Sequence, residues 1–274
     1  MTVTASAPST ATAPPGHPSS SLGLAEVLSD VRVMVGRSLR RSSRDGEALV
    51  MAVMLPVALM LLFVYVFGGA IEVGTDYINY VVPGIILLCA GFGAASTATY
   101  VANDAVTGVV DRFRSMPIFG SACLIGHVVA SVVRNLLATV VVIGVALLIG
   151  WRPSAGPVEW LLTLVFLVLF MTAVSFLSAA LGLLVGSVEA ANSVTFVMLF
   201  LPYVSSAFVP PDTMPAALRG FAEHQPITPM IETLRGLLMG SVIGSSWWIA
   251  AVEWAAVLAV SAVGAGLLFR RKTR

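Results

Sequence analysis

Long apolar stretches alternate with short polar or charged segments along most of the chain. A helix needs about 20 apolar residues to cross the hydrocarbon core of a bilayer, which is about 30 Å thick. By this length criterion the pattern predicts six membrane-spanning helices, at about 48–71, 78–103, 124–150, 160–187, 191–209 and 248–269. The predicted fold class is therefore an all-α polytopic membrane protein, with its transmembrane domain over 47–271 and a basic tail at 272–274.

Two segments of different character precede the first predicted span. Residues 1–21 are mostly Ala, Pro, Ser and Thr, which predicts a disordered cytoplasmic leader rather than a signal peptide. From 22 to 46, apolar residues recur at helical spacing, and arginines that include Arg37, Arg40 and Arg41 fill the other face. This pattern is typical of an amphipathic helix lying in the membrane interface, and an ordinary solvated helix is the alternative.

Between the fifth and sixth predicted spans the chain is long and rich in proline. Pro226 and Pro229 begin a largely apolar stretch that also contains Glu232 and Arg235. Interruption by proline predicts re-entrant helices that dip into the outer leaflet and stop before the sixth span. A seventh crossing would place the basic tail outside, against the usual bias of positive charge toward the cytoplasm.

The composition and the charge distribution agree with this topology. The chain is 58% apolar and 11% charged, with a mean hydropathy of +0.95, whereas soluble domains are about 45–50% apolar with glycine included. Eleven of the fifteen basic residues lie before the first predicted span, between the second and third, or after the sixth. Because basic residues concentrate in cytoplasmic loops, both termini are predicted to be cytoplasmic.

The residue types needed for catalysis or metal binding do not occur in suitable patterns. The single lysine, Lys272, lies in the tail, so the phosphate-binding loop of an ATPase, which ends in Lys-Ser/Thr, is excluded from this chain. The histidines and cysteines lack the paired spacing of a zinc or redox site: His17, His127, His224, Cys89 and Cys123. We therefore expect no catalytic residue, metal or cofactor in this chain, and no nucleic-acid partner.

For the ionisable and the small residues within the predicted spans, a structural role and a functional role are both consistent with the sequence. Arg134 is expected to snorkel toward the cytoplasmic end or to pair near it, and Glu253 could be neutralised by Arg235 or Arg219, although a transport role is possible for both. The small residues of Gly182-x-x-x-Gly186 permit close helix approach, either between copies of the chain or in ordinary membrane packing.

The segment after the second predicted span has the most informative sequence, Asp-Ala-Val-Thr-Gly-Val-Val-Asp-Arg-Phe-Arg-Ser-Met-Pro over 104–117. Gly108 allows a turn, Arg112 and Arg114 need water or a partner, and Phe113 and Met116 share an apolar stripe of a short helix. An amphipathic helix at this face can insert into a groove of another protein. A merely solvated loop is the alternative.

This segment from Gly108 to Pro117 resembles the cytoplasmic loop of ABC type-2 exporter permeases, and within them the daunorubicin-resistance type. A second resemblance follows in the same order, from Ser205-Ser-Ala-Phe-Val-Pro-Pro through Gln225-Pro-Ile-Thr-Pro to Leu234-Arg-Gly-Leu-Leu-Met-Gly. The resemblance implies that the loop is a coupling helix seated on a separate ATP-binding subunit, which binds ATP and Mg. Its implied coupling residues are Gly108, Asp111, Arg112, Phe113, Arg114, Met116 and Pro117.

The resemblance also implies a connecting helix over 22–46, re-entrant helices after Pro226, and a second permease copy, identical or a sister chain. One departure is visible, because Asp104 is followed by Ala105 and Val106 where relatives carry a basic residue, which puts a charge contact to the ATPase in doubt.

The implied function is export of amphipathic drugs, antibiotics or lipid-like metabolites across the bacterial plasma membrane, with hydrophobic small molecules as cargo and membrane lipid around the spans. A polysaccharide- or glycolipid-exporting permease and a non-transporting membrane scaffold remain alternatives.

Overall fold

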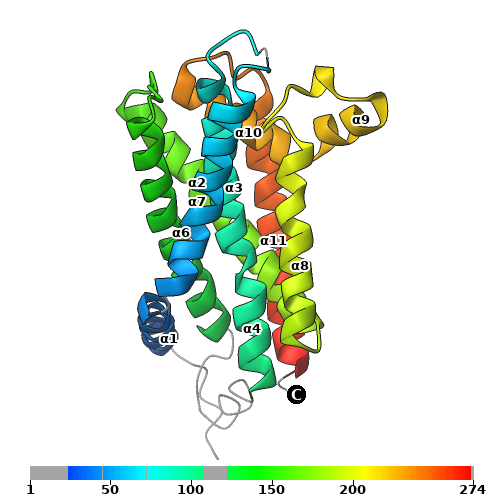
Figure 1. The fold of residues 1–274 in the computed structure, drawn as a ribbon. Coiled ribbons are helices and arrows are strands. Elements are labelled where there is room, and N and C mark those ends of the chain that lie inside the picture. The colour runs from blue at the N-terminus through cyan, green and yellow to red at the C-terminus, as the bar shows by residue number, and fades with distance from the viewer. Residues whose placement is uncertain (1–23, 45, 72, 108–121, 273–274) are drawn as a thin grey trace, which may run out of the picture.

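The computed structural model of this protein describes residues 24–44, 46–71, 73–107 and 122–272, and in these ranges it contains helices and no strands. The all-α prediction is therefore confirmed for the described chain. The predicted leader at 1–21 lies outside it. The helices are α1 (Leu24–Arg44), α2 (Gly46–Leu61), η1 (Leu62–Phe67), α3 (Tyr77–Ala95), α4 (Thr97–Val106), α6 (Ala122–Leu148), α7 (Pro157–Leu184), α8 (Val188–Phe200), η2 (Leu201–Val204), η3 (Pro211–Thr213), α9 (Ala216–His224), α10 (Ile227–Met239) and α11 (Ser246–Lys272) (Figure 1).

The long helices run side by side and alternate in direction between two ends of a bundle (Figure 1). Helix α1 lies across one end, where α4 also ends and where α11 brings the chain to its C-terminus. Helices α9 and α10 lie at the opposite end. The amphipathic segment predicted over 22–46 and the proline-rich segment after the fifth predicted span therefore occupy opposite ends of the molecule.

Within the described residues, five helical segments are long and apolar enough to cross a bilayer: Val50–Phe67, Tyr77–Val106, Ala122–Leu148, Pro157–Leu184 and Ser246–Arg271. They match five of the six predicted spans. The remaining prediction, at 191–209, corresponds to a shorter apolar helix over Val188–Val204. It ends early because the chain turns after Pro202, where the hydroxyl of Ser205 donates a hydrogen bond to the Pro202 carbonyl.

The second predicted span consists of two helices, α3 and α4, with a break at Ser96. The Ser96 hydroxyl donates to the carbonyl of Gly93 at 2.7 Å, a local side-chain bond that competes with regular helical pairing and bends helices. This span is also the most enclosed, since 83% of its apolar window is buried, against 17% for the first span and 22% for the last. The broken helix is thus the centre of the bundle.

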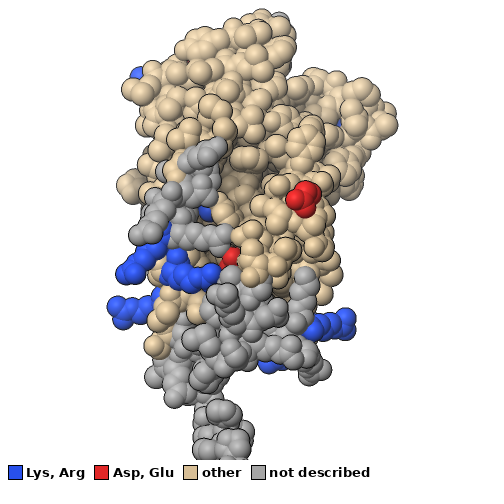
Figure 2. Space-filling model, turned by 60° about the horizontal axis from the view of Figure 1, so that its bottom comes forward, with Lys and Arg blue, Asp and Glu red and all other residues tan. Residues whose placement is uncertain are grey.

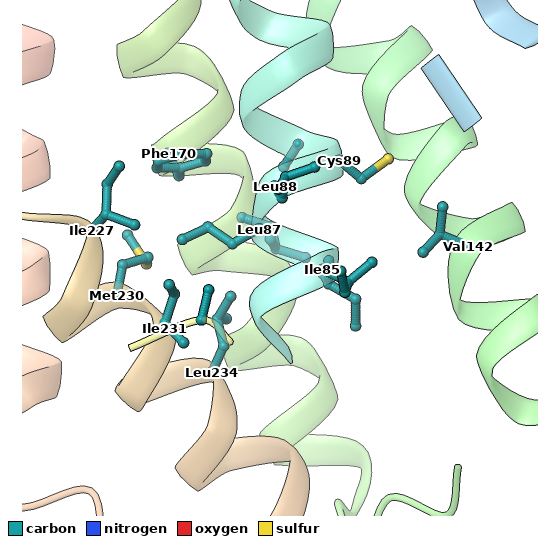
Figure 3. Close-up of a cluster of buried hydrophobic side chains, with 14 of the residues drawn as sticks. Ile85, Leu87, Leu88, Cys89, Val142, Phe170, Ile227, Met230, Ile231 and Leu234 are labelled. Carbon is teal, nitrogen blue, oxygen red and sulfur yellow. The ribbon is translucent and has the colours of Figure 1, made fainter. Parts of the chain in front are cut away.

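The apolar core surrounds α3, between α10 on one side and α6 on the other (Figure 3). Ile85, Leu87 and Leu88 of α3 are fully buried, as are Met230 and Ile231 of α10. Helix α10 has 13 residues, so it is about 20 Å long and too short to cross a bilayer. A left-handed glycine, Gly240 with φ 68°, ends it. Helix α10 is therefore a core element at one end of the bundle and not an additional span.

Candidate functional site

The seven predicted coupling positions between Gly108 and Pro117 lie outside the described residues, but the helices that carry the chain into and out of this loop are described. Helix α4 enters the loop and α6 leaves it, and both reach the end of the bundle where α1 lies (Figure 1). The contacts between these three helices therefore fix the points where the described chain enters and leaves this segment.

A buried carboxylate joins α1, α4 and α6. Asp104, on the last turn of α4, is 2% exposed. Its Oδ2 lies 3.0 Å from Nε2 of His127 on α6 and 3.5 Å from Nη2 of Arg37 on α1. A buried charge is costly unless it is paired and hydrogen-bonded, and here partners on two other helices supply that pairing. One side chain thereby links all three elements at the base of the loop.

The same cluster contains the residue types of a metal site. The ligand atoms of Asp104, Cys123 and His127 lie within 4.8 Å of one another. Cys and His four residues apart on a helix, with a carboxylate, form a ligand set that zinc accepts. However, the Arg37 guanidinium already places a positive charge beside the carboxylate oxygen that a metal would use. We therefore interpret the cluster as an ion-pair site.

Close backbone packing reinforces this junction. A Cβ added to Gly126 on α6 would lie 3.0 Å from the carbonyl carbon and oxygen of Met34, so α1 crosses α6 with almost no side chain between them. Met34 is buried at this crossing. Arg37 follows Met34 by one helical turn and His127 directly follows Gly126. The ion pair and the backbone crossing thus occur at the same place.

The remaining predicted residues of α1 fit a charged surface. Arg40 is exposed, and the side chain of Arg41 lies outside the described residues. Arg32, Arg37 and Arg40 line an open depression of about 560 Å³ on α1. Figure 2 shows basic side chains gathered over this end of the molecule, whereas the rest of the visible surface is mostly uncharged.

A second polar region lies deeper in the bundle, around the break in the second span. Arg134 of α6 is 8% exposed, and its Nη2 donates to the hydroxyl of Ser96 at 3.1 Å and to the Gly93 carbonyl at 3.4 Å. Its guanidinium also lies 4.9 Å from the centre of the Tyr100 ring. The expectation of snorkelling is therefore wrong, because Arg134 binds the α3–α4 junction inside the bundle.

At the opposite end, Arg235 attaches α10 to its surroundings. Its Nη2 donates to the Ser206 carbonyl at 2.6 Å, its Nε donates to the Tyr80 carbonyl at 3.1 Å, and its guanidinium lies 3.8 Å from the centre of the Tyr80 ring. Burial lowers the pKa of the guanidinium, and the neighbouring Tyr80 and Glu232 oppose this shift. Arg235 therefore connects α10, α3 and the turn after η2.

The other residues predicted in this region also make structural contacts. The Pro226 carbonyl accepts a hydrogen bond from Nε1 of Trp254 at 3.0 Å, and the Pro229 carbonyl accepts one from Thr233 at 2.7 Å. The carboxylate of Glu232 accepts one from the hydroxyl of Ser246 at 2.7 Å, which links α10 to the start of α11. The contacts of Pro226 and Glu232 thus attach α10 to α11, and the contact of Pro229 lies within α10 itself.

Glu253 does not have either of the suggested partners in the described structure. Arg219 forms ion pairs with Asp212 and Glu223, both at 2.7 Å. Arg235 binds backbone carbonyls instead. One carboxylate oxygen of Glu253, Oε2, is buried without a hydrogen-bond partner among the described residues. The expectation of a basic partner for Glu253 is therefore wrong for this part of the chain.

Sequence reasoning missed the pairing of Asp104 with His127. The sequence puts a charge contact of Asp104 with the ATPase in doubt and predicts no catalytic or metal role for His127, whereas the structure buries the two side chains against each other. A signal was present in the sequence, because the two residues flank the same short loop, one at the end of a span and one at the start of the next. Which faces of those helices meet, however, depends on tertiary packing.

Comparison with known proteins identifies relatives over most of the chain. The model of the ABC-2 type transporter family matches residues 29–239. The chain is 29% identical over 191 residues to a daunorubicin resistance ABC transporter permease protein of Streptomyces coeruleorubidus, which covers 69% of this chain and 68% of the relative. It is 25% identical over 241 residues to a probable doxorubicin resistance ABC transporter permease protein of Mycobacterium tuberculosis, covering 87% of each.

Proposed function

The chain belongs to the ABC-2 type transporter family, and from this premise we propose that it is the permease subunit of an ABC exporter that moves amphipathic drugs, antibiotics or lipid-like metabolites out of the cell. The observation that carries the proposal is the family match over 29–239. The family supplies membrane-spanning subunits, so a separate ATP-binding subunit binds ATP and Mg and hydrolyses the ATP. Relatives named for daunorubicin and doxorubicin resistance support a partly apolar cargo.

The arrangement of the bundle supports a bacterial plasma-membrane protein with both termini in the cytoplasm. Helix α1 and the end of α11 lie at the same end, and basic side chains gather there (Figures 1 and 2). Basic residues favour the cytoplasmic side of a membrane. In this orientation the helix over Val188–Val204 completes a sixth crossing, α1 lies in the cytoplasmic interface, and α9 and α10 form the re-entrant outer region.

The loop between α4 and α6 is the coupling element in this proposal. Gly108, Asp111, Arg112, Phe113, Arg114, Met116 and Pro117 contact the ATP-binding subunit, and α1 connects beside them. The geometry of the described residues supports this assignment, because Arg37, Asp104 and His127 join α1 to both helices that carry the loop. A displacement of the loop by the ATPase is thereby passed to two spans.

The exposed apolar faces are covered by membrane lipid and by a second permease copy, identical or a sister chain. The first and last spans are only 17% and 22% buried within one chain. An open apolar groove of about 570 Å³ follows α2 and α6, lined by residues such as Val53, Val57 and Val145. Large apolar surfaces of this kind require a bilayer or a partner.

Reconstitution tests the proposal directly. The chain is co-expressed with the ATP-binding subunit, and uptake of a fluorescent anthracycline into inside-out vesicles is measured with and without ATP. We expect ATP-dependent uptake only when both chains are present. Uptake by this chain alone would contradict the two-subunit assignment, and uptake of polysaccharide but not drug would support the alternative cargo. A complex that forms but transports neither cargo would support the scaffold alternative.

A charge reversal tests the loop within the same system. Arg112→Glu combined with Arg114→Glu is expected to abolish co-purification of the ATPase and uptake, because both changes fall on the proposed docking helix. Arg270→Glu combined with Arg271→Glu is the matched control, since it reverses two charges at the same end but outside the loop. Equal loss in both double variants would show a general charge effect and argue against the loop as the docking element.

A further inference from the structure

We infer that Asp104 is a positioning residue that makes α1, α4 and α6 move as one body when the cytoplasmic loop is displaced. The inference rests on the proposed function for its effect on transport, but the mechanical link stands on the described contacts alone. Asp104 lies at the last turn of α4, and His127 lies on the second turn of α6. Their contact at 3.0 Å therefore closes the base of the loop.

The third partner brings in a helix that is distant from the loop along the chain. Arg37 of α1 lies 3.5 Å from the same carboxylate oxygen that contacts His127. If that carboxylate moves with α4, both the imidazole of α6 and the guanidinium of α1 are drawn with it. The shared oxygen makes the three helices interdependent in a way that two separate ion pairs would not.

Close backbone packing brings α1 and α6 together beside this link. A Cβ on Gly126 of α6 would lie 3.0 Å from the Met34 carbonyl of α1, so the glycine allows the two helices to approach closely. Arg37 and His127 flank this crossing. Packing therefore places α1 against α6, and the carboxylate of Asp104, through Arg37 and His127, restrains the two helices and adds α4 to the same unit.

The burial of Asp104 separates this role from docking. At 2% exposure its carboxylate is not available to a partner surface, and it lies inside the junction instead. Removal of its charge is therefore expected to leave docking of the ATPase intact while weakening the transmission of movement. Mutations of residues that carry such coupling without touching a ligand change it by about two- to thirtyfold.

The direct test measures the mobility of α1 against α6. In the full chain, with Cys89→Ala and Cys123→Ser, spin labels are placed at Ser29→Cys on α1 and Val140→Cys on α6, both exposed positions. We expect Asp104→Asn to broaden the distance distribution between the labels. Arg37→Gln removes the same link from the α1 side, through a side chain that is 38% exposed, so it reports even if Asp104→Asn does not fold.

A matched control separates transmission from general destabilisation. The Thr97 hydroxyl of α4 donates to Ser131 of α6 at 2.9 Å and is buried, so Thr97→Val weakens the contact between the same two helices without involving α1. Thr97→Val is expected to lower thermal stability but to leave the label distances narrow. In the reconstituted complex, Asp104→Asn should lower transport per ATP hydrolysed about two- to thirtyfold, and Thr97→Val should not.

The outcomes distinguish this inference from the proposed function. A narrow distribution in both Asp104→Asn and Arg37→Gln would overturn the link, whatever the chain transports. Broadening with unchanged transport per ATP would overturn the role of Asp104 in transmission. Loss of ATPase co-purification in Asp104→Asn would also overturn that role, because it would assign the residue to docking. Broadening when the wild-type complex transports nothing would support the link and count against the proposed function.

Discussion

Replacement of Arg235 by methionine tests how α10 is held in the bundle. Methionine keeps an unbranched side chain of similar reach but removes the charge and the donors. The carbonyls of Tyr80 and Ser206 then lose donors that lie 3.1 and 2.6 Å away, and the Tyr80 ring loses the cation stacked on it. Because α3 and the turn after η2 both depend on this side chain, the change releases α10 from two neighbours.

The size of the effect follows from these contacts. A hydrogen bond from a charged donor contributes about 1.5–3 kcal/mol, and a cation–π contact about 0.5–2 kcal/mol. Part of this is offset because the variant no longer has to remove a guanidinium from water. We therefore expect Arg235→Met to lower the free energy of unfolding by about 3 kcal/mol. At about 2–4 °C per kcal/mol for a chain of this size class, the midpoint should fall by roughly 6–12 °C.

Two buried free cysteines, Cys89 and Cys123, provide the assay. Purified protein in detergent is heated with a thiol-reactive dye that fluoresces when the cysteines become accessible, and the apparent midpoint is recorded. Arg219→Met is the matched control at the same end, since Arg219 is exposed and its ion pairs contribute little. If Arg235→Met lowers the midpoint no more than Arg219→Met, the assignment of Arg235 as the anchor of α10 is refuted.

Two further predictions concern packing and buried charge. A Cβ at Gly182 would lie 2.4 Å from the Ala98 carbonyl oxygen, whereas one at Gly186 would meet nothing within 4 Å, so Gly182→Ala should cost about 1–3 kcal/mol in the dye assay and Gly186→Ala less than about 0.5 kcal/mol. An equal effect would point to contacts of Gly186 with another chain. Glu253→Gln removes a carboxylate that has a buried oxygen without a hydrogen-bond partner among the described residues, so it should not lower the midpoint; a fall of several degrees would reveal a partner for the charge.

The helices could be predicted from the sequence because apolar length is a local property. The fourth span, predicted at 160–187, is Pro157–Leu184, and the sixth, predicted at 248–269, is contained in α11. The break at Ser96 was missed, because it depends on one serine bonding back to Gly93 and on the space that Arg134 fills beside it. Such a break has no signature in hydropathy.

Most contacts of the candidate site could not be predicted from the sequence. Arg37 and His127 were visible as individual residues, but their meeting at Asp104 requires that α1 cross α6 at Gly126. Arg235 and Tyr80 are 155 positions apart along the chain. Pairing across that separation is decided by which helices are neighbours, and periodicity within one helix carries no information about this.

The two ends of the bundle are held by contacts of different strength. At the end that carries α9 and α10, Arg235 donates to two backbone carbonyls, one of them at 2.6 Å, so the contact depends on the positions of the main chain itself. At the other end, Arg37 lies 3.5 Å from Asp104, and the Arg37 side chain is 38% exposed, so water competes with the carboxylate for the guanidinium. The buried pair of Asp104 and His127, 3.0 Å apart, still holds α4 to α6, so the three helices can shift together at this end. This difference favours movement at the end where the proposed ATPase docks and rigidity around α10.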